Sequence, residues 1–218
     1  MKIFYKKSNL IRHLNELRPS SSPIGFVPTM GALHLGHLSL IKQCLNNNKI
    51  SVVSIFVNPT QFNNTSDLIT YPKNLNKDIK LLEKLSKDII IFSPKSTEIY
   101  SEKITTNKYD FNGLDKFMEG EFRSNHFQGV ATVVELLLGI VKPNSAYFGE
   151  KDFQQLAIIR SLKNKVNIVG CPTLRDVNGL ALSSRNIKLS DNSKTIASNI
   201  FKNLNFIKSN FYKSSLQN

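Results

Sequence analysis

Two histidines, His34 and His37, are the residues of this chain whose types and spacing best suit chemistry. They end the stretch PTMGALHLGH at 28–37, which follows an apolar run at 24–27 and precedes apolar residues at helical spacing. A helix start offers unpaired N–H groups and a positive dipole end, so it can hold a phosphate. Imidazoles there can donate hydrogen bonds to charged phosphate oxygens. A surface pair or half of a metal site fits the same two residues, so all three interpretations are open on this stretch alone.

Two glutamines follow apolar runs and could read a polar substrate. Gln61 follows the run at 50–57, and Gln155 lies in the first turn of a later helix. Because an amide both donates and accepts, it can recognise a hydroxyl or a carboxylate. A lone glutamine can equally be a solvated loop residue.

Two further loops carry groups that suit phosphate oxygens. In GEKD at 149–152, a glycine at a strand end precedes Lys151, which suits a closely approaching nucleotide, although a plain turn in which Asp152 caps the next helix fits as well. The loop at 180–186 supplies Ser183, Ser184 and Arg185, two hydroxyls and a guanidinium, for polyphosphate or for helix capping.

Arg123 and His126 precede a strongly apolar helix. They are either a further anion contact or part of a polar loop.

Composition predicts an ordinary globular protein. The 218 residues are 40% hydrophobic and 21% charged, and no apolar stretch approaches the ~20 residues that a membrane span needs. The basic N-terminus lacks the apolar core of a secretory signal. Cys44 and Cys171 lie in apolar surroundings without metal-ligand spacing, which indicates a reduced, cytoplasmic protein.

The net charge of +13 does not by itself predict nucleic-acid binding. Lysine outnumbers arginine 23 to 6, and the lysines are spread along the chain without interleaved aromatic residues. We therefore expect neither a nucleic-acid partner nor a membrane partner.

Apolar periodicity predicts an α/β fold. Strands are expected over 24–27, 50–57, 88–92, 146–148 and 166–169, a lesser strand or hairpin over 103–111, and helices over 9–18, 38–45, 74–87, 129–141 and 156–162. This alternation indicates a parallel sheet with helices on both faces, in which ligands bind beyond the carboxyl ends of the strands. The four polar loops follow such ends, so we expect one site at that edge.

Together the four loops resemble the pantoate–β-alanine ligases (pantothenate synthetases) of the HIGH-signature nucleotidyltransferase group. The resemblance is carried by VPTMGALHLGH at 27–37, VSIFVNPTQF at 53–62, YFGEKDFQQL at 147–156 and DVNGLALSSRN at 176–186. It runs from about residue 3 to 190 and implies a Rossmann-like sheet with a short helical C-terminal remnant. It also implies that pantoate reacts with ATP to give pantoyl adenylate and pyrophosphate, and that β-alanine then displaces AMP.

The resemblance also implies roles for individual residues. His37 is expected to be the proton donor, within a catalytic set of His34, His37, Lys151, Ser183, Ser184 and Arg185. Expected ATP contacts are Met30, Gly31, Ala32, Leu33, His34, Leu35, Gly36, His37, Gly149, Glu150, Lys151, Asp152, Leu174, Leu182, Ser183, Ser184 and Arg185. Gln61 is expected to bind pantoate and β-alanine, and Gln155 pantoate. Mg²⁺ is expected on the ATP phosphates, with Asp78 as a candidate outer contact and no protein ligand assigned.

Two regions are expected. Residues 1–180 form the nucleotide-binding catalytic domain, and 181–218 comprise the LSSRN loop and a remnant of a truncated C-terminal lid, a helix with a polar tail. The helix has an apolar stripe that needs a second surface, on the main domain or on another subunit: Ile196, Ile200, Leu204, Ile207 and Phe211. The family precedent is a homodimer. Two alternatives are open, another nucleotidyltransferase of the same group and an ATP-binding or dimerisation module with weakened catalysis.

Overall fold

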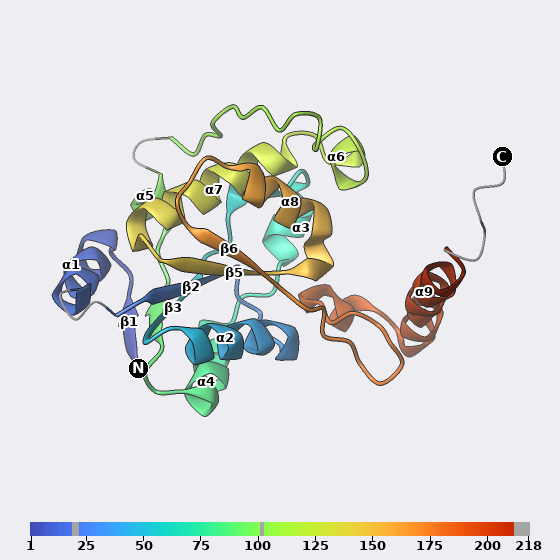
Figure 1. The fold of residues 1–218 in the computed structure, drawn as a ribbon, viewed down its shortest axis with the longest axis horizontal. Helices are drawn as coiled ribbons and strands as arrows, with labels where there is room; N and C mark the ends of the chain where they lie inside the picture. Colours follow the sequence, from blue (N-terminus) through green and yellow to red (C-terminus); the bar gives the residue numbers. More distant parts are fainter. Residues whose placement is uncertain (19–21, 101–102, 212–218) are drawn as a thin grey trace.

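The computed structural model describes residues 1–18, 22–100 and 103–211 of the chain. Within them a six-stranded parallel sheet has the order β1-β4-β3-β2-β5-β6 (Figure 1). The strands are β1 (Lys2–Phe4), β2 (Ile24–Thr29), β3 (Ile50–Ile55), β4 (Ile90–Phe92), β5 (Ser145–Gly149) and β6 (Asn167–Cys171). The predicted parallel sheet is confirmed, and the short strand β1 is an addition to it.

Helices connect the strands and cover both faces of the sheet (Figure 1). They are α1 (Lys7–Leu17), α2 (Leu35–Asn47), α3 (Thr65–Thr70), α4 (Leu75–Leu85), α5 (Ser96–Ile99), α6 (Glu119–Phe122), α7 (His126–Val141), α8 (Phe153–Ser161) and α9 (Asp191–Asn210). Short 3₁₀ turns occupy Pro59–Gln61, Glu150–Asp152 and Ser184–Lys188. All three turns lie in loops that the sequence assigns to the site.

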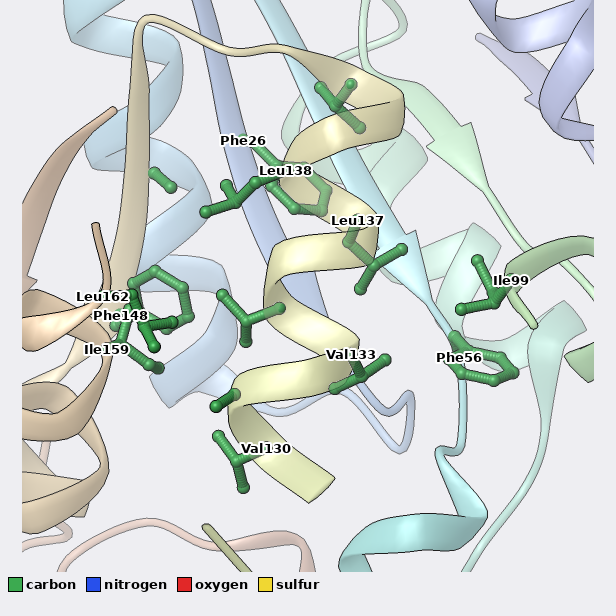
Figure 2. Close-up of a cluster of buried hydrophobic side chains, with 14 of the residues drawn as sticks. Phe26, Phe56, Ile99, Val130, Val133, Leu137, Leu138, Phe148, Ile159 and Leu162 are labelled. Atoms are coloured by element: carbon green, nitrogen blue, oxygen red, sulfur yellow. The ribbon is translucent and has the colours of Figure 1, made fainter. Parts of the chain in front are cut away.

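The core is divided by the sheet into two clusters. Side chains alternate along β2, so Phe26 faces the helices α1, α7 and α8, whereas Val27 faces α2 and α4. The first cluster is the larger, and α7 supplies much of it, including Val130, Val133, Leu137 and Leu138 (Figure 2). Because strands covered on both faces are apolar throughout, they appear in the sequence as continuous apolar runs.

Pro28 does not end its strand, contrary to the prediction that the strand stops at Val27. β2 continues to Thr29, and Pro28 stands opposite Ser54 of β3. On its other side, β2 pairs with β5 only at Gly25 and Phe26. A proline is tolerated here because one flank of the strand has no partner at this height.

The strand or hairpin predicted over 103–111 is wrong, because these residues form no regular secondary structure. Side chains of α7 satisfy backbone groups of this segment instead. Gln128 accepts a hydrogen bond from the Tyr109 N–H at 2.8 Å and donates one to the Tyr109 carbonyl at 3.0 Å, while Thr132 accepts one from the Asn107 N–H at 2.9 Å. An extended segment bonded to a helix shows weak strand-like alternation without a partner strand.

The predicted C-terminal helix is present as α9, and one of the two surfaces predicted to cover its apolar stripe, the main domain, does not do so. Phe201 packs beneath the Arg175 guanidinium, with 4.1 Å between Cζ and the ring centroid. Every member of the apolar stripe is exposed, from Leu204 at 50% to Phe211 at 68%. The stripe therefore does not pack on the main domain. The predicted polar tail falls in 212–218, outside the described residues.

Candidate active site

A turn with unusual backbone angles carries the two histidines to the edge of the sheet. Gly31 and Ala32 both have positive φ, +78° and +50°, directly after β2. Asp78 of α4 holds this turn, since its carboxylate accepts hydrogen bonds from the N–H of Ala32 at 3.0 Å and of Leu33 at 2.8 Å. On the other side, the Ser184 hydroxyl donates to the Ala32 carbonyl at 3.1 Å. The turn is therefore anchored from two sequence-distant elements.

Asp78 is 2% exposed, and burial raises the pKa of its carboxyl group, against the effect of the two N–H donors. Both of its oxygens are engaged by the backbone, and it lies outside the wall of the cavity that His34 and His37 line. No group of three or more His, Cys, Asp or Glu in the described ranges is arranged to hold a metal. This donor set does not fit a protein-held Mg²⁺.

Both histidine rings have their Nδ1 atoms engaged by the backbone at the start of α2. The Nδ1 of His34 accepts the Gly36 N–H at 3.1 Å, and the Nδ1 of His37 accepts the His34 N–H at 3.3 Å. An Nδ1 that accepts carries no hydrogen, so the neutral rings hold theirs on Nε2. Each imidazole is thus a neutral hydrogen-bond donor through Nε2.

Burial keeps these rings neutral. Burial, together with His34 and Lys151, lowers the pKa of His37 to about 3. Burial and Lys151 also lower the pKa of His34. The ring centroids are 4.1 Å apart, so charging one ring would disfavour charging the other.

One cavity brings the four predicted loops together. Among the predicted residues, its wall contains Met30, His34, Gly36, His37, Gln61, Gly149, Lys151, Asp152, Gln155, Leu174, Leu182, Ser183, Ser184 and Arg185. Five predicted ATP contacts lie outside this wall: Gly31, Ala32, Leu33, Leu35 and Glu150. The first three belong to the anchored turn, and Leu35 is 65% exposed.

The cations of the cavity are held by exposed acidic partners. Arg185 bonds Asp67 of α3 at 2.8 Å, and Lys188 lies 3.6 Å from the same carboxylate. Lys151 pairs with Asp152 at 2.8 Å. The Arg185 side chain hydrogen bond holds the pKa of Asp67 below its ordinary value.

The prediction that Asp152 caps the next helix is wrong. Asp152 occupies the N-cap position of α8, but its side chain makes no capping hydrogen bond. The ion pair with Lys151 takes its place.

An adjoining pocket shares part of this wall. Gln61, Gln155, His37 and Met30 belong to both cavities. The second pocket has an apolar side formed by Phe56, Val130, Val133, Val134, Leu137 and Phe148, and its polar lining includes Thr29 and Asn58. Sequence reasoning missed these apolar residues as site residues because their periodicity is that of the core. It also missed Tyr71, whose ring lies 5.6 Å from the Arg185 guanidinium and for which the sequence gives no signal.

Arg123 and His126 also line the cavity, and both form a hydrogen bond with the same atom. The main-chain carbonyl of Gln61 lies 2.8 Å from His126 Nδ1 and 3.3 Å from an Arg123 guanidinium nitrogen.

A family model described as Pantoate-beta-alanine ligase matches residues 2–218. The chain belongs to this family. Two curated relatives are named pantothenate synthetases. That of Christiangramia forsetii is 52% identical over 206 residues, which cover 93% of this chain and 73% of the relative. That of Flavobacterium psychrophilum is 51% identical over 208 residues, which cover 94% of this chain and 74% of the relative.

Solved structures of the pantoate–β-alanine ligase family share the fold. Pantothenate synthetase from Thermus thermophilus superposes with a TM-score of 0.89 at 40% identity, covering 98% of this chain and 76% of that one. The ligase from Francisella tularensis, described as complexed with beta-gamma ATP and β-alanine, gives 0.86 at 42% identity, covering 93% and 78%. The resemblance of the four loops to this family is confirmed.

Proposed function

We propose that the chain catalyses the ATP-dependent condensation of (R)-pantoate with β-alanine, giving pantothenate, AMP and pyrophosphate through pantoyl adenylate. One observation carries this proposal. A cavity lined by Lys151, Arg185 and two serine hydroxyls shares a wall with a pocket that has an apolar side, and in this wall Gln61 and Gln155 supply amides. Such a site can hold a polyphosphate beside a small acid that has both hydroxyl and methyl groups.

In the first step, the pantoate carboxylate attacks the α-phosphorus of ATP and pyrophosphate leaves. Negative charge grows on the phosphate oxygens, and fixed donors can stabilise it. The proposed donors are the Nε2 atoms of His34 and His37, the ammonium of Lys151, the hydroxyls of Ser183 and Ser184, and the guanidinium of Arg185. In place of the expected proton transfer from His37, we propose that a neutral His37 imidazole donates a hydrogen bond from Nε2, because its Nδ1 accepts the His34 N–H and burial lowers its pKa to about 3.

The shape of pantoate suits the shared wall. Its two methyl groups would lie among apolar side chains such as Val133, Val134 and Phe148, and its hydroxyls and carboxylate would meet Gln61 and Gln155. In the second step, the β-alanine amine attacks the acyl carbon and AMP leaves, and Gln61 is proposed to bind β-alanine as well. The Francisella relative is described as complexed with β-alanine, which supports β-alanine as the amine substrate.

Mg²⁺ is proposed to arrive on the ATP phosphates, where it would neutralise part of their charge. The chain's own contribution is the set of cationic and neutral donors named above. Met30, Gly36, Gly149, Asp152, Leu174 and Leu182 are the further proposed ATP contacts in the cavity wall.

The described residues contain no helix that is long and apolar enough to cross a membrane. We propose a cytoplasmic homodimer whose residues 1–180 form the catalytic domain and whose segment 181–218 begins with the phosphate-binding loop.

The test is a two-part assay on the purified chain. We expect pyrophosphate release from ATP only when pantoate is present, and AMP release together with pantothenate only when β-alanine is added. A product that retains the nucleotide would indicate another nucleotidyltransferase. ATP binding without either release would indicate a non-catalytic module and would contradict the proposal.

A further inference from the structure

The 3₁₀ turn Pro59–Gln61 carries Gln61 into the cavity, and its own backbone holds it weakly. Its hydrogen bonds are long: Gln61 N–H to the Asn58 carbonyl at 3.4 Å, and Phe62 N–H to the Pro59 carbonyl at 3.2 Å. The hydrogen-bond geometry of 3₁₀ turns is poor, and such turns are short. The direction of the Gln61 side chain therefore depends on contacts with other elements.

Tyr100, which follows α5, donates a hydrogen bond to Asn58 Oδ1 at 2.6 Å, and further contacts come from the start of α7. Gly129 allows the turn to approach, because a Cβ at this position would lie 2.2 Å from the Thr60 carbonyl oxygen. Asn58, which is 1% exposed, donates to the Gly129 carbonyl at 3.3 Å. The turn thus rests directly on the helix backbone.

Among the hydrogen bonds between α7 and this turn, that of His126 is the shortest. Its Nδ1 lies 2.8 Å from the Gln61 carbonyl oxygen, and the residue is 7% exposed. A carbonyl oxygen only accepts, so Nδ1 carries the hydrogen and donates it. Burial lowers the pKa of His126 to about 4, with Arg123 lowering it further, so the ring is a neutral donor near pH 7.

Arg123 supports the same carbonyl from outside. One guanidinium nitrogen lies 3.3 Å from the Gln61 oxygen, while another bonds Glu119 at 3.1 Å. Both residues therefore donate to the Gln61 carbonyl, although they lie in the cavity wall.

We propose that His126, assisted by Arg123, is a positioning residue that fixes Gln61 for reading pantoate and β-alanine. This role rests on the proposed ligase function. His126 acts through the Gln61 main chain, so the two residues should behave as one unit. The ATP contacts lie on other loops and should not depend on this bond.

The experiment is a double-mutant cycle with kcat/KM for pantoate and β-alanine and KM for ATP as readouts. His126→Ala should lower both kcat/KM values about tenfold, the effect of losing one buried hydrogen bond, and leave KM for ATP within about twofold. In a Gln61→Ala background, the same change should lower kcat/KM by no more than about twofold.

Two variants guard against a purely structural explanation. His126→Asn places an amide donor near the position of Nδ1 and should restore kcat/KM to within about threefold of wild type. Gln128→Ala is the matched control, because Gln128 lies on the same helix and bonds the backbone of Tyr109 but not that of Gln61. It should leave all three parameters within about twofold of wild type.

Additive effects of His126→Ala and Gln61→Ala, or a rise in KM for ATP alone, would overturn the positioning role even when the wild-type chain is active. If His126→Ala does not fold, the same decision falls to His126→Asn in the wild-type and Gln61→Ala backgrounds: a loss of kcat/KM that is equally large in both backgrounds would overturn the role. A wild-type chain without pantoate-dependent pyrophosphate release would overturn the proposed function itself.

Discussion

Gln61 and Arg185 line the same cavity, but they are held there in different ways. The Gln61 carbonyl is bonded by a histidine that is 7% exposed. Arg185 is held by Asp67 in an ion pair whose side chains are 46% and 35% exposed. A buried hydrogen bond is costly to break, whereas an exposed ion pair contributes little to stability, so its partners can be exchanged readily.

The difference matches the roles proposed for Gln61 and Arg185. An amide that reads hydroxyl and carboxylate groups must be fixed before the substrate arrives. A guanidinium that meets phosphates needs only to be kept nearby, because a polyphosphate can replace Asp67 as its partner. The cavity therefore combines a fixed wall, which contains Gln61, with an exchangeable wall, which contains Arg185.

The largest expected effect comes from His37, which lines the cavity and is held by neither His126 nor Asp67. His37→Ala removes the Nε2 donor, and we expect pantoate-dependent pyrophosphate release to fall by about 10²–10³. The unfolding temperature should change little. His13→Ala is the control, since His13 lies on α1 and outside the cavity. A His37→Ala enzyme with full activity would contradict the role assigned to the donor.

The exchangeable wall should respond through ATP alone. Arg185→Ala is expected to raise KM for ATP about tenfold and to change KM for pantoate by less than about twofold, because a charge-assisted contact to phosphate is lost. Steady-state kinetics measure both values, with Arg12→Ala on the exposed face of α1 as the control. An equal rise in both KM values would remove the distinction between the walls.

The fixed wall should be sensitive to pH through His126. The unfolded ring binds a proton near pH 6.5, but the folded ring does so only near 4. Between these values the unfolded state binds more protons, so stability falls as pH falls. We expect the free energy of unfolding to drop by about 2 kcal/mol from His126 between pH 6.5 and 5. Denaturant titrations at both pH values should show this drop reduced in His126→Asn, and an unchanged slope would contradict the assignment.

The smallest effect is expected from Asp67. Asp67→Asn removes the carboxylate that competes with phosphate for Arg185, so KM for ATP should fall about twofold. The free energy of unfolding should change by less than about 0.5 kcal/mol. Asp191→Asn, which breaks the exposed pair with Lys194 on α9, is the control. A large loss of stability would show that the Asp67 pair is structural and not exchangeable.

The strands and the four loops could be predicted because local sequence carries them. Buried strands such as β3 are continuous apolar runs, and the loops at their ends contain the histidines, glutamines and serines of the cavity wall. Strand β1 has only three residues, too few to show a period.

The anchors of the site could not be predicted, because they act across long stretches of sequence. Asp78 meets Ala32 from 46 residues away, and His126 meets Gln61 from 65 residues away. Nothing in the residues around Asp78 distinguishes an anchor from a metal contact. The sequence marks Arg123 and His126 as a further anion contact or part of a polar loop, but their shared target, the Gln61 carbonyl, appears only in three dimensions.

A crystal structure with a non-hydrolysable ATP analogue and pantoate tests the fixed and exchangeable walls most directly. We predict that Arg185 leaves Asp67 for the phosphates, that His37 Nε2 lies within hydrogen-bond distance of a phosphate oxygen, and that the Gln61 carbonyl still accepts from His126 Nδ1. A complex in which Arg185 remains on Asp67 while the Gln61–His126 bond breaks would contradict the account.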